Sequence, residues 1–303
     1  MRPPEVLVIG DANPDLVLTG DPTNLVPQFG QVEKLVDSAD LVLGGSAAIA
    51  ACGLARLGVP TALAALVGDD FFGEFVRREL TAAGVDTRWV RTDPAVATAL
   101  SVVLSAGDRA ILTFPGALAA TGPDVVDRDL LNQVRHVHSA SMFLQPRLAP
   151  HLPDIFAAAR SGGATTSLDT NWDPAELWHG VFPLLENTDI VFPNTAELIA
   201  MTGCADVDGA AERVLELGCR VALKDGASGG RLWEPGRAVI AAPASATDAV
   251  DTTGAGDSFD AGYISAMIEG RSGADCLARA VVCGSLSTRS LGGTAAQARR
   301  ADL

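Results

Sequence analysis

Positive charge is scarce in this sequence. Lysine occurs only at Lys34 and Lys224, and 22 lysine and arginine residues stand against 37 acidic ones, which gives a net charge of -15. A nucleic acid or an anionic membrane surface requires a basic face on the protein that binds it. We therefore expect neither a nucleic acid nor a membrane among the partners of this chain.

Paired cysteines and long apolar runs are lacking as well. The cysteines are odd in number and form no C-x-x-C pair, which predicts neither a disulfide framework nor a zinc site; they are Cys52, Cys204, Cys219, Cys276 and Cys283. The longest apolar region, residues 41–67, is interrupted by glycines, Arg56 and Pro60, so we do not expect it to span a membrane. Residues 1–5 do not resemble a signal peptide, and we expect a cytoplasmic protein.

Two familiar nucleotide-binding motifs are also missing. The chain contains no G-x-x-x-x-G-K-[ST] loop, and no G-x-G-x-x-G follows its first predicted strand, which argues against a dinucleotide-dependent dehydrogenase.

Hydrophobic residues make up 48% of the chain and charged residues 19%, a composition typical of a folded protein. A chain of 303 residues can form one large α/β domain or two smaller ones.

The order of apolar runs predicts a parallel sheet with helices on both faces. Residues 6–9 form a short, continuous apolar strand, and from residue 134 strands at 136–139, 165–168 and 190–192 alternate with helices near 153–160 and from Pro174. Ligands of such sheets bind at the carboxyl ends of the strands. The polar side chains expected at those ends are Asp169, Asn171, Asn194, Lys224 and Asp225.

One stretch carries the strongest chemical signal. Residues 251–257, D-T-T-G-A-G-D, place small residues directly before a predicted helix that runs from Asp257 to residue 269. Unpaired backbone N–H groups and the helix dipole make such a turn suitable for holding a phosphate. Asp257, beside the transferring phosphoryl group, could accept the proton of an attacking hydroxyl. The alternative is that Asp257 is only the helix N-cap.

The same residues resemble a known family. The D-T-x-G-A-G-D form is similar to the C-terminal signature of ribokinase-like (PfkB) carbohydrate kinases, and G-G-S-A-A-I-A-A at residues 44–51 resembles their N-terminal signature, G-G-x-x-x-N-x-A. The resemblance covers nearly the whole chain. It implies one kinase domain over residues 1–303, with a three-layer αβα fold, a mainly parallel central sheet and a small β lid.

The resemblance also implies roles for individual residues. Asp257 would be the general base, and Gly254, Ala255 and Gly256 would form the anion hole. The residues implied in sugar binding are Asn13, Asp15, Gly44, Gly45 and Asp169. Considered alone, residues 11–15 favour an ordinary Asx-Pro turn, and the small residues after Gly45 could serve close helix packing.

The implied nucleotide site uses ATP and Mg²⁺. K-x-G-x-x-G, with Lys224, Gly226 and Gly229, would contact the nucleotide, although many β-turns have this pattern. In the family's N-x-x-E motif, Asn194 and Glu197 would order magnesium-bound water, and the same pair forms an Asn-type capping box. Asp251 is implied in a monovalent-cation loop, which would bind K⁺ together with residues 287–293.

Two positions depart from the family pattern. Ile49 stands where the family usually has a sugar-contacting Asn, and Asp173 replaces the Arg of D-x-N-x-R. The Ile49 position predicts a less common or differently oriented substrate. The loss of the Arg weakens the case for a sugar acid.

Two β-type segments, residues 16–43 and 98–114, match the lid of such kinases. The first contains predicted strands at 16–18 and 34–36, and the second a hairpin whose strands, 99–104 and 110–114, flank Gly107 and Asp108. A lid of this kind covers the sugar, excludes water and often forms a homodimer contact.

The function predicted is ATP-dependent phosphorylation of a small sugar. The alternatives are a nucleoside kinase of the same fold and a non-catalytic nucleotide-binding regulator.

Overall fold

Short, fully buried aliphatic runs form the central strands of the protein. In the computed structural model, which describes residues 2–106, 109–245 and 248–303, all four residues of the first strand have no exposed surface. The strands are β1 (Val6–Ile9), β2 (Asn13–Thr19), β3 (Ser38–Gly44), β4 (Thr61–Gly68), β5 (Val90–Asp93), β6 (Leu100–Ser105), β7 (Arg109–Phe114), β8 (His136–Ala140), β9 (Thr165–Asp169), β10 (Ile190–Val191), β11 (Arg220–Lys224), β12 (Gly230–Trp233) and β13 (Ile240–Ala242).

Nine of these strands form one sheet in the order β13-β12-β11-β10-β9-β8-β1-β4-β5. The pairs from β11 to β5 are parallel, and β12 at one edge pairs antiparallel with both β11 and β13. Because parallel strands share one direction, their carboxyl ends meet at one edge of the sheet. That edge is where polar side chains can gather around a ligand.

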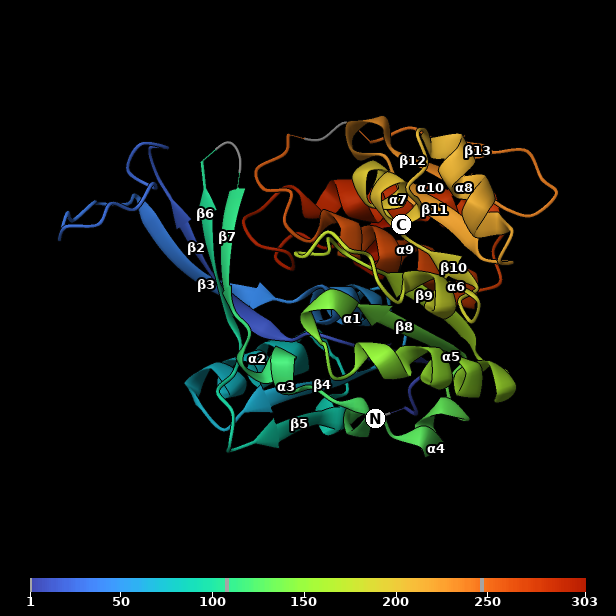
Figure 1. Ribbon diagram of the computed structural model, residues 1–303, viewed down its shortest axis with the longest axis horizontal. Coiled ribbons are helices and arrows are strands. Elements are labelled where there is room, and N and C mark those ends of the chain that lie inside the picture. The colour runs from blue at the N-terminus through green and yellow to red at the C-terminus, as the bar shows by residue number, and fades with distance from the viewer. Residues whose placement is uncertain (1, 107–108, 246–247) are drawn as a thin grey trace.

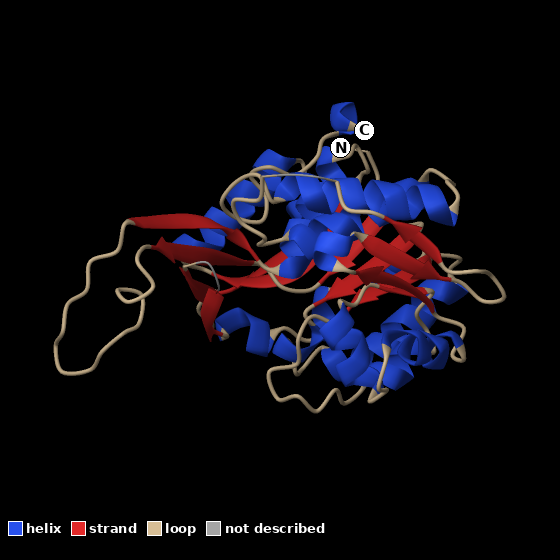
Figure 2. Cartoon of the chain, turned by 90° about the horizontal axis from the view of Figure 1, so that it is seen from above, coloured by secondary structure: helices blue, strands red, loops and turns tan. Residues whose placement is uncertain are grey.

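Helices cover both faces of this sheet (Figure 2). The helices are α1 (Ser46–Arg56), α2 (Phe71–Ala83), α3 (Gly116–Ala120), α4 (Arg128–Leu131), α5 (Leu152–Ser161), α6 (Val181–Leu185), α7 (Thr195–Thr202), α8 (Val207–Leu215), α9 (Ala255–Ile268) and α10 (Gly273–Ser287). One hydrophobic core includes residues of α1, α2, α9 and α10, and the other includes residues of α4 to α8. The described residues form no helix that is long and apolar enough to span a bilayer.

A second sheet, in the order β3-β2-β6-β7, projects from the αβα body (Figure 1). It is built from the two segments expected to form the lid, residues 16–43 and 98–114. The prediction of a strand at residues 34–36 is wrong. The last residue of β2, Thr19, pairs with Ser38, so β2 has no residue left to pair with residues 34–36. The predicted turn at Gly107 and Asp108 lies outside the described residues.

The helix expected from Pro174 is also wrong, because α6 begins only at Val181. The carboxylate of Asp173 accepts hydrogen bonds from the backbone N–H groups of Ala175 (2.9 Å), Leu177 (2.9 Å) and Trp178 (2.7 Å). These bonds hold the chain in a turn and occupy donors that a helix would direct to its own carbonyls. Most of the other predicted elements occur within a few residues of their expected positions.

Candidate active site

Two charged side chains mark the carboxyl edge of the large sheet. Asp169 ends β9 and Lys224 ends β11, on either side of β10. The ammonium of Lys224 donates to Asp169 Oδ2 at 2.6 Å, and both side chains are largely buried. The sheet thus brings together two predicted site residues that lie 55 positions apart in the sequence.

The small-residue turn of residues 254–256 leads into α9 at the same edge. Gly254 is the N-cap with φ 70°, and a Cβ there would lie 2.6 Å from Gly293 Cα, so a side chain would meet both backbone strain and a steric clash. Asp257 is the third residue of the helix and is 7% exposed. The interpretation of Asp257 as the N-cap is therefore wrong.

A network of side chains surrounds the Asp257 carboxyl group. The Ser46 hydroxyl at the start of α1 hydrogen-bonds to Asp257, and Asn171 Nδ2 donates to Ser46 Oγ at 2.9 Å. The backbone N–H of Asn171 donates to Asp169 Oδ1 at 3.1 Å, so the network links the ends of β9, α1 and α9. Burial, followed by the negative charge of Asp169, raises the pKa of Asp257 well above its usual range.

Asp11 is a site residue to which the sequence analysis gave no role. Its carboxylate accepts hydrogen bonds from the backbone N–H groups of Ser46 (3.1 Å) and Ala47 (2.9 Å), and thereby caps α1 across 35 residues of chain. Burial raises the pKa of Asp11. Its place directly after the buried β1 strand was a signal that could have identified it.

The residues expected to bind a sugar lie where the small sheet meets the body. Asn13 Nδ2 donates to Asp15 Oδ1 at 2.9 Å, and Asp15 is paired with Ser101 in the register of β2 and β6. A Cβ at Gly44 would lie 2.2 Å from the Asp15 carboxylate, so only glycine leaves room for that group. Gly45, also expected here, is the N-cap of α1. Burial and the charge of Asp11 raise the pKa of Asp15 to about 7.

The residues expected to bind nucleotide follow β10 and β11. Asn194 and Glu197 form a reciprocal capping box on α7, with N–H to carboxylate and N–H to amide oxygen distances of 2.8 and 2.9 Å. Burial is the main cause that raises the pKa of Glu197. Gly226 and Gly229 lie in the turn between β11 and β12. Lys224, the last residue before this turn, points its side chain toward the buried Asp169.

Asp251 holds two loops together beside the small-residue turn of residues 254–256. Its carboxylate accepts hydrogen bonds from the backbone N–H groups of Thr253 (2.9 Å) and Gly292 (2.8 Å). Arg109 of β7 donates to Thr253 Oγ1 at 2.6 Å and lies 4.0 Å from Asp251 Oδ1. The small sheet therefore directly contacts Thr253, which precedes the small-residue turn.

The two departures from the family pattern have structural roles. Ile49 is 3% exposed, and its side chain packs against the positions that Cβ atoms of Gly254 and Gly293 would occupy. The Ile49 side chain thus supports the small-residue turn of residues 254–256 by packing against Gly254. Asp173, which is 4% exposed, organises the turn after β9.

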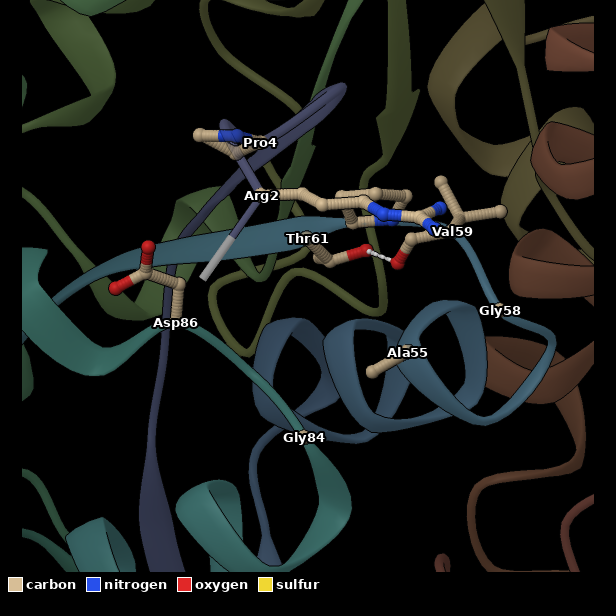
Figure 3. A pocket seen from close by; sticks show the side chains of 9 residues that line it. Arg2, Pro4, Ala55, Gly58, Val59, Thr61, Gly84 and Asp86 are labelled. Atoms are coloured by element: carbon tan, nitrogen blue, oxygen red, sulfur yellow. Dashed lines mark hydrogen bonds between the residues drawn. The ribbon is translucent and has the colours of Figure 1, made fainter.

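A separate hollow lies at the opposite edge of the sheet (Figure 3). It is lined by Pro4 and Val59, which precede β1 and β4, by Thr61, the first residue of β4, and by Asp86. The Thr61 hydroxyl donates to the Val59 carbonyl at 2.9 Å, and Asp86 is paired with Arg88 at 2.6 Å. These groups already have partners, and the hollow lies away from the carboxyl ends of the strands.

Comparisons with known proteins agree with this geometry. Residues 3–299 match the pfkB family of carbohydrate kinases. An ATP-dependent ribose-1-phosphate kinase from Halopiger xanaduensis is 34% identical over 256 residues, which cover 80% of this chain and 79% of that protein.

Solved structures with the same fold include proteins with bound ligands. Arabidopsis thaliana ribokinase, complexed with ribose and ATP, is 27% identical, with a TM-score of 0.85 over 100% of this chain and 97% of that chain. An E. coli structure with ATP and Mg²⁺ is 24% identical and has a TM-score of 0.88 over 99% of this chain and 97% of that chain. The predicted fold class, a three-layer αβα fold with a mainly parallel sheet and a small β lid, is confirmed.

Proposed function

The chain belongs to the pfkB family of carbohydrate kinases and is an ATP-dependent sugar kinase, and from this premise we propose that Asp257 is the general base of the reaction. The observation that carries the proposal is the place of Asp257 in the first turn of α9, buried and directly after the small-residue turn. A base at this point lies beside the N–H groups that would hold the transferring phosphoryl group.

The proposed step is an in-line phosphoryl transfer. The sugar hydroxyl loses its proton to Asp257, its oxygen forms a bond to the γ-phosphorus, and the bond from that phosphorus to the β–γ bridging oxygen breaks, which releases ADP. The backbone N–H groups of residues 254–256 would stabilise the negative charge that develops. Gly254 supports this role, because its left-handed conformation turns the chain into the helix N-terminus.

Mg²⁺ and ATP would bind on the side of α7 and the β11–β12 turn. Asn194 and Glu197 hold each other in the capping box, which supports a fixed position for Glu197. Glu197 would order water on Mg²⁺, which neutralises the phosphates, and Gly226 and Gly229 would lie along the nucleotide. Asp251 and residues 287–293 would hold K⁺, mainly through backbone carbonyls.

The acceptor is proposed to be a small sugar held by Asp15 and Asn13, with Gly44, Gly45 and Asp169 lining its site. Carboxylate and amide groups at the base of the lid can each bond more than one hydroxyl. The relatives act on different compounds, since one is named for ribose-1-phosphate and one is a ribokinase solved with ribose. Ribose and ribose-1-phosphate are therefore the first acceptors to test. A nucleoside remains the alternative, and family membership favours an enzyme over a regulator.

The small sheet is proposed to act as the lid and as the contact of a homodimer. Arg109 supports the first role, because it joins β7 to Thr253 at the catalytic turn. Exposed apolar side chains on β7, including Leu112 at 62% and Phe114 at 54%, support the second role. A cytoplasmic location is proposed as well, and the five free cysteines fit a reducing compartment.

The test is ADP release from ATP and Mg²⁺ with ribose, ribose-1-phosphate, hexoses, sugar acids and nucleosides as acceptors, in K⁺ and in Na⁺. We expect a sugar to stimulate turnover and K⁺ to increase it. Asp257→Asn should lower kcat by about 10²–10⁴-fold, because the amide cannot accept the hydroxyl proton. Stimulation by nucleosides alone would favour a nucleoside kinase. Full activity of the Asp257→Asn variant would exclude Asp257 as the general base.

A further inference from the structure

A lysine lies inside the acidic cluster next to the proposed base. The Lys224 ammonium contacts Asp169 Oδ2 at 2.6 Å and Asp260 Oδ2 at 3.6 Å. Carboxylate oxygens of Asp169, Asp257 and Asp260 all lie within 4.8 Å of one another. Three carboxyl groups this close could hold a metal ion, but here the ammonium already lies among them and serves as their cation.

The lysine also packs against the anion-hole turn. A Cβ at Gly256 would lie 3.3 Å from both Cδ and Nζ of Lys224, so the end of the lysine side chain runs along the backbone just before Asp257. The side chain is 13% exposed, and Asp260, one helical turn after Asp257, has no exposed surface. The geometry therefore fixes the ammonium between β9 and the first turn of α9.

The charges around Asp257 determine its proton affinity. Those that act on it come from three other segments and from its own helix; they are Asp169 of β9, Lys224 of β11, Asp11 after β1 and Asp260 of α9. Glu197 and His138 face the Lys224–Asp169 pair from α7 and β8. Burial and the neighbouring carboxylates raise the pKa of Asp257, whereas Lys224 lowers it.

The pKa values of Asp260 and Asp169 are shifted in opposite directions. Burial raises the pKa of Asp260 well above its usual range, while Lys224 keeps the pKa of Asp169 low in spite of its burial. Neither carboxyl oxygen of Asp260 has a hydrogen-bond partner among the described residues, and burial favours the neutral form of this group. This leaves the Lys224 charge to offset the charges of Asp169 and Asp257.

We propose that Lys224 is a positioning residue for phosphoryl transfer, whose ammonium, held by Asp169 and Asp260 against Gly256, supplies the counter-charge that lets Asp257 accept the hydroxyl proton. The proposal rests on the proposed role of Asp257 as base. Without the ammonium, the pKa of Asp257 would rise further, and the carboxyl group would keep its proton to a higher pH. The lysine would then control the pH range of the kinase, rather than its affinity for ATP.

The test compares Lys224→Met with the wild type in the pH profile of kcat at saturating sugar and MgATP, where the Asp15-dependent change in sugar affinity does not contribute. We expect the acid limb to move to higher pH by at least about 1 pH unit, because a nearby opposite charge changes a carboxyl pKa by roughly that much or more. At a pH on the acid limb, kcat should fall about tenfold per unit of that movement. Lys224→Arg should keep the limb near its wild-type position.

Matched variants complete the design. Lys34→Met changes the other lysine of the chain, which bonds to the Thr23 carbonyl in the lid connection, and should leave the limb in place. Asp169→Asn removes a negative neighbour and should move the limb downward, which tests the same electrostatics if Lys224→Met does not fold. The proposal would be overturned if Lys224→Met raised the KM for ATP and left the acid limb of the pH profile in place. It would also be overturned if Asp169→Asn left the acid limb in place. The base is judged separately, on wild-type turnover and Asp257→Asn, and absent turnover in the wild type would overturn both proposals.

Discussion

At the scale of single residues, the ionisation of Asp15 should control sugar affinity. Its pKa is about 7, raised by burial and by Asp11, and a carboxylate accepts hydrogen bonds from sugar hydroxyls more strongly than a carboxylic acid does. Above pH 7 the carboxylate is present and binding should be constant. As the pH falls below 7, the group becomes protonated, and the Kd for sugar should rise by up to about tenfold per pH unit.

Calorimetric titration of sugar in the absence of nucleotide measures this dependence without interference from the ionisation of ATP. Asp15→Asn should weaken binding by roughly tenfold or more at pH 8, because a bond to a charged acceptor is replaced, and should remove the transition near pH 7. Asp21→Asn is the control, since Asp21 is an exposed carboxylate in the lid connection. A transition that persists in Asp15→Asn would assign the titration to another group.

At the scale of elements, the N-terminus of α7 carries a stabilising capping box and is the proposed place of Mg²⁺ and nucleotide binding. Asn194→Ala removes the cap from Glu197 N–H and should lower the free energy of unfolding by about 1 kcal/mol. It also removes the partner that fixes Glu197, so the KM for MgATP should rise several-fold. Urea unfolding and steady-state kinetics measure the two effects separately.

The neighbouring helix α8 provides a matched control. Asp206 is its N-cap and accepts from Gly209 N–H at 2.9 Å on an exposed part of the chain. Asp206→Ala should therefore lower stability by a similar amount and leave the KM for MgATP unchanged. If both variants change stability alike and neither changes the KM, Asn194 serves only as a cap.

The elements also show what the sequence could and could not predict. Buried parallel strands such as β1 are recognisable because continuous apolar runs bounded by turn residues are a local pattern. The start of α6 was not recognisable, because Asp173 redirects the chain through side-chain bonds to later backbone N–H groups. Residues 34–36 have strand-like composition, but the end of β2 leaves them without a partner.

Within the site, strand order placed Asp169 and Lys224 at the carboxyl edge of the sheet, and the small-residue turn placed Gly254 and Asp257 at the start of a helix. Their electrostatic relations were not accessible, because they depend on long-range contacts such as the ion pair between Lys224 and Asp169. The resemblance implied that Lys224 contacts the nucleotide, but nothing in the sequence indicated that its side chain also packs against Gly256. The capping role of Asp11 depends in the same way on α1, which begins 35 residues later.

At the scale of the whole molecule, the two faces of the lid sheet differ. Strand register places Asp15, Ser101 and Thr113 on one face, which also carries Arg109 and therefore faces Thr253 before the small-residue turn. The opposite face is apolar and partly or fully exposed; it consists of Leu16, Leu18, Val102, Leu104, Leu112 and Phe114. An apolar sheet face of this kind is suited to bury itself against the same face of a second copy.

Two adjacent residues of β7 test this arrangement. Leu112, on the apolar outer face, is 62% exposed, and Ile111, on the site face, is 59% exposed. Leu112→Glu places a charge in the proposed interface and should convert a dimer into a monomer in sedimentation experiments at micromolar concentrations. Ile111→Glu introduces the same charge at equal exposure on the other face and should leave the dimer intact while raising the KM for sugar.

Opposite effects of two substitutions one residue apart would follow only from the two-faced lid, because composition, exposure and net charge change equally in both variants. A monomeric wild type would exclude the dimer, and equal loss of association in both variants would indicate a general disruption of the lid. If Leu112→Glu becomes monomeric and also raises the KM for sugar, the dimer supports the lid that closes over the substrate. Association of two chains would then contribute to catalysis through the position of the lid.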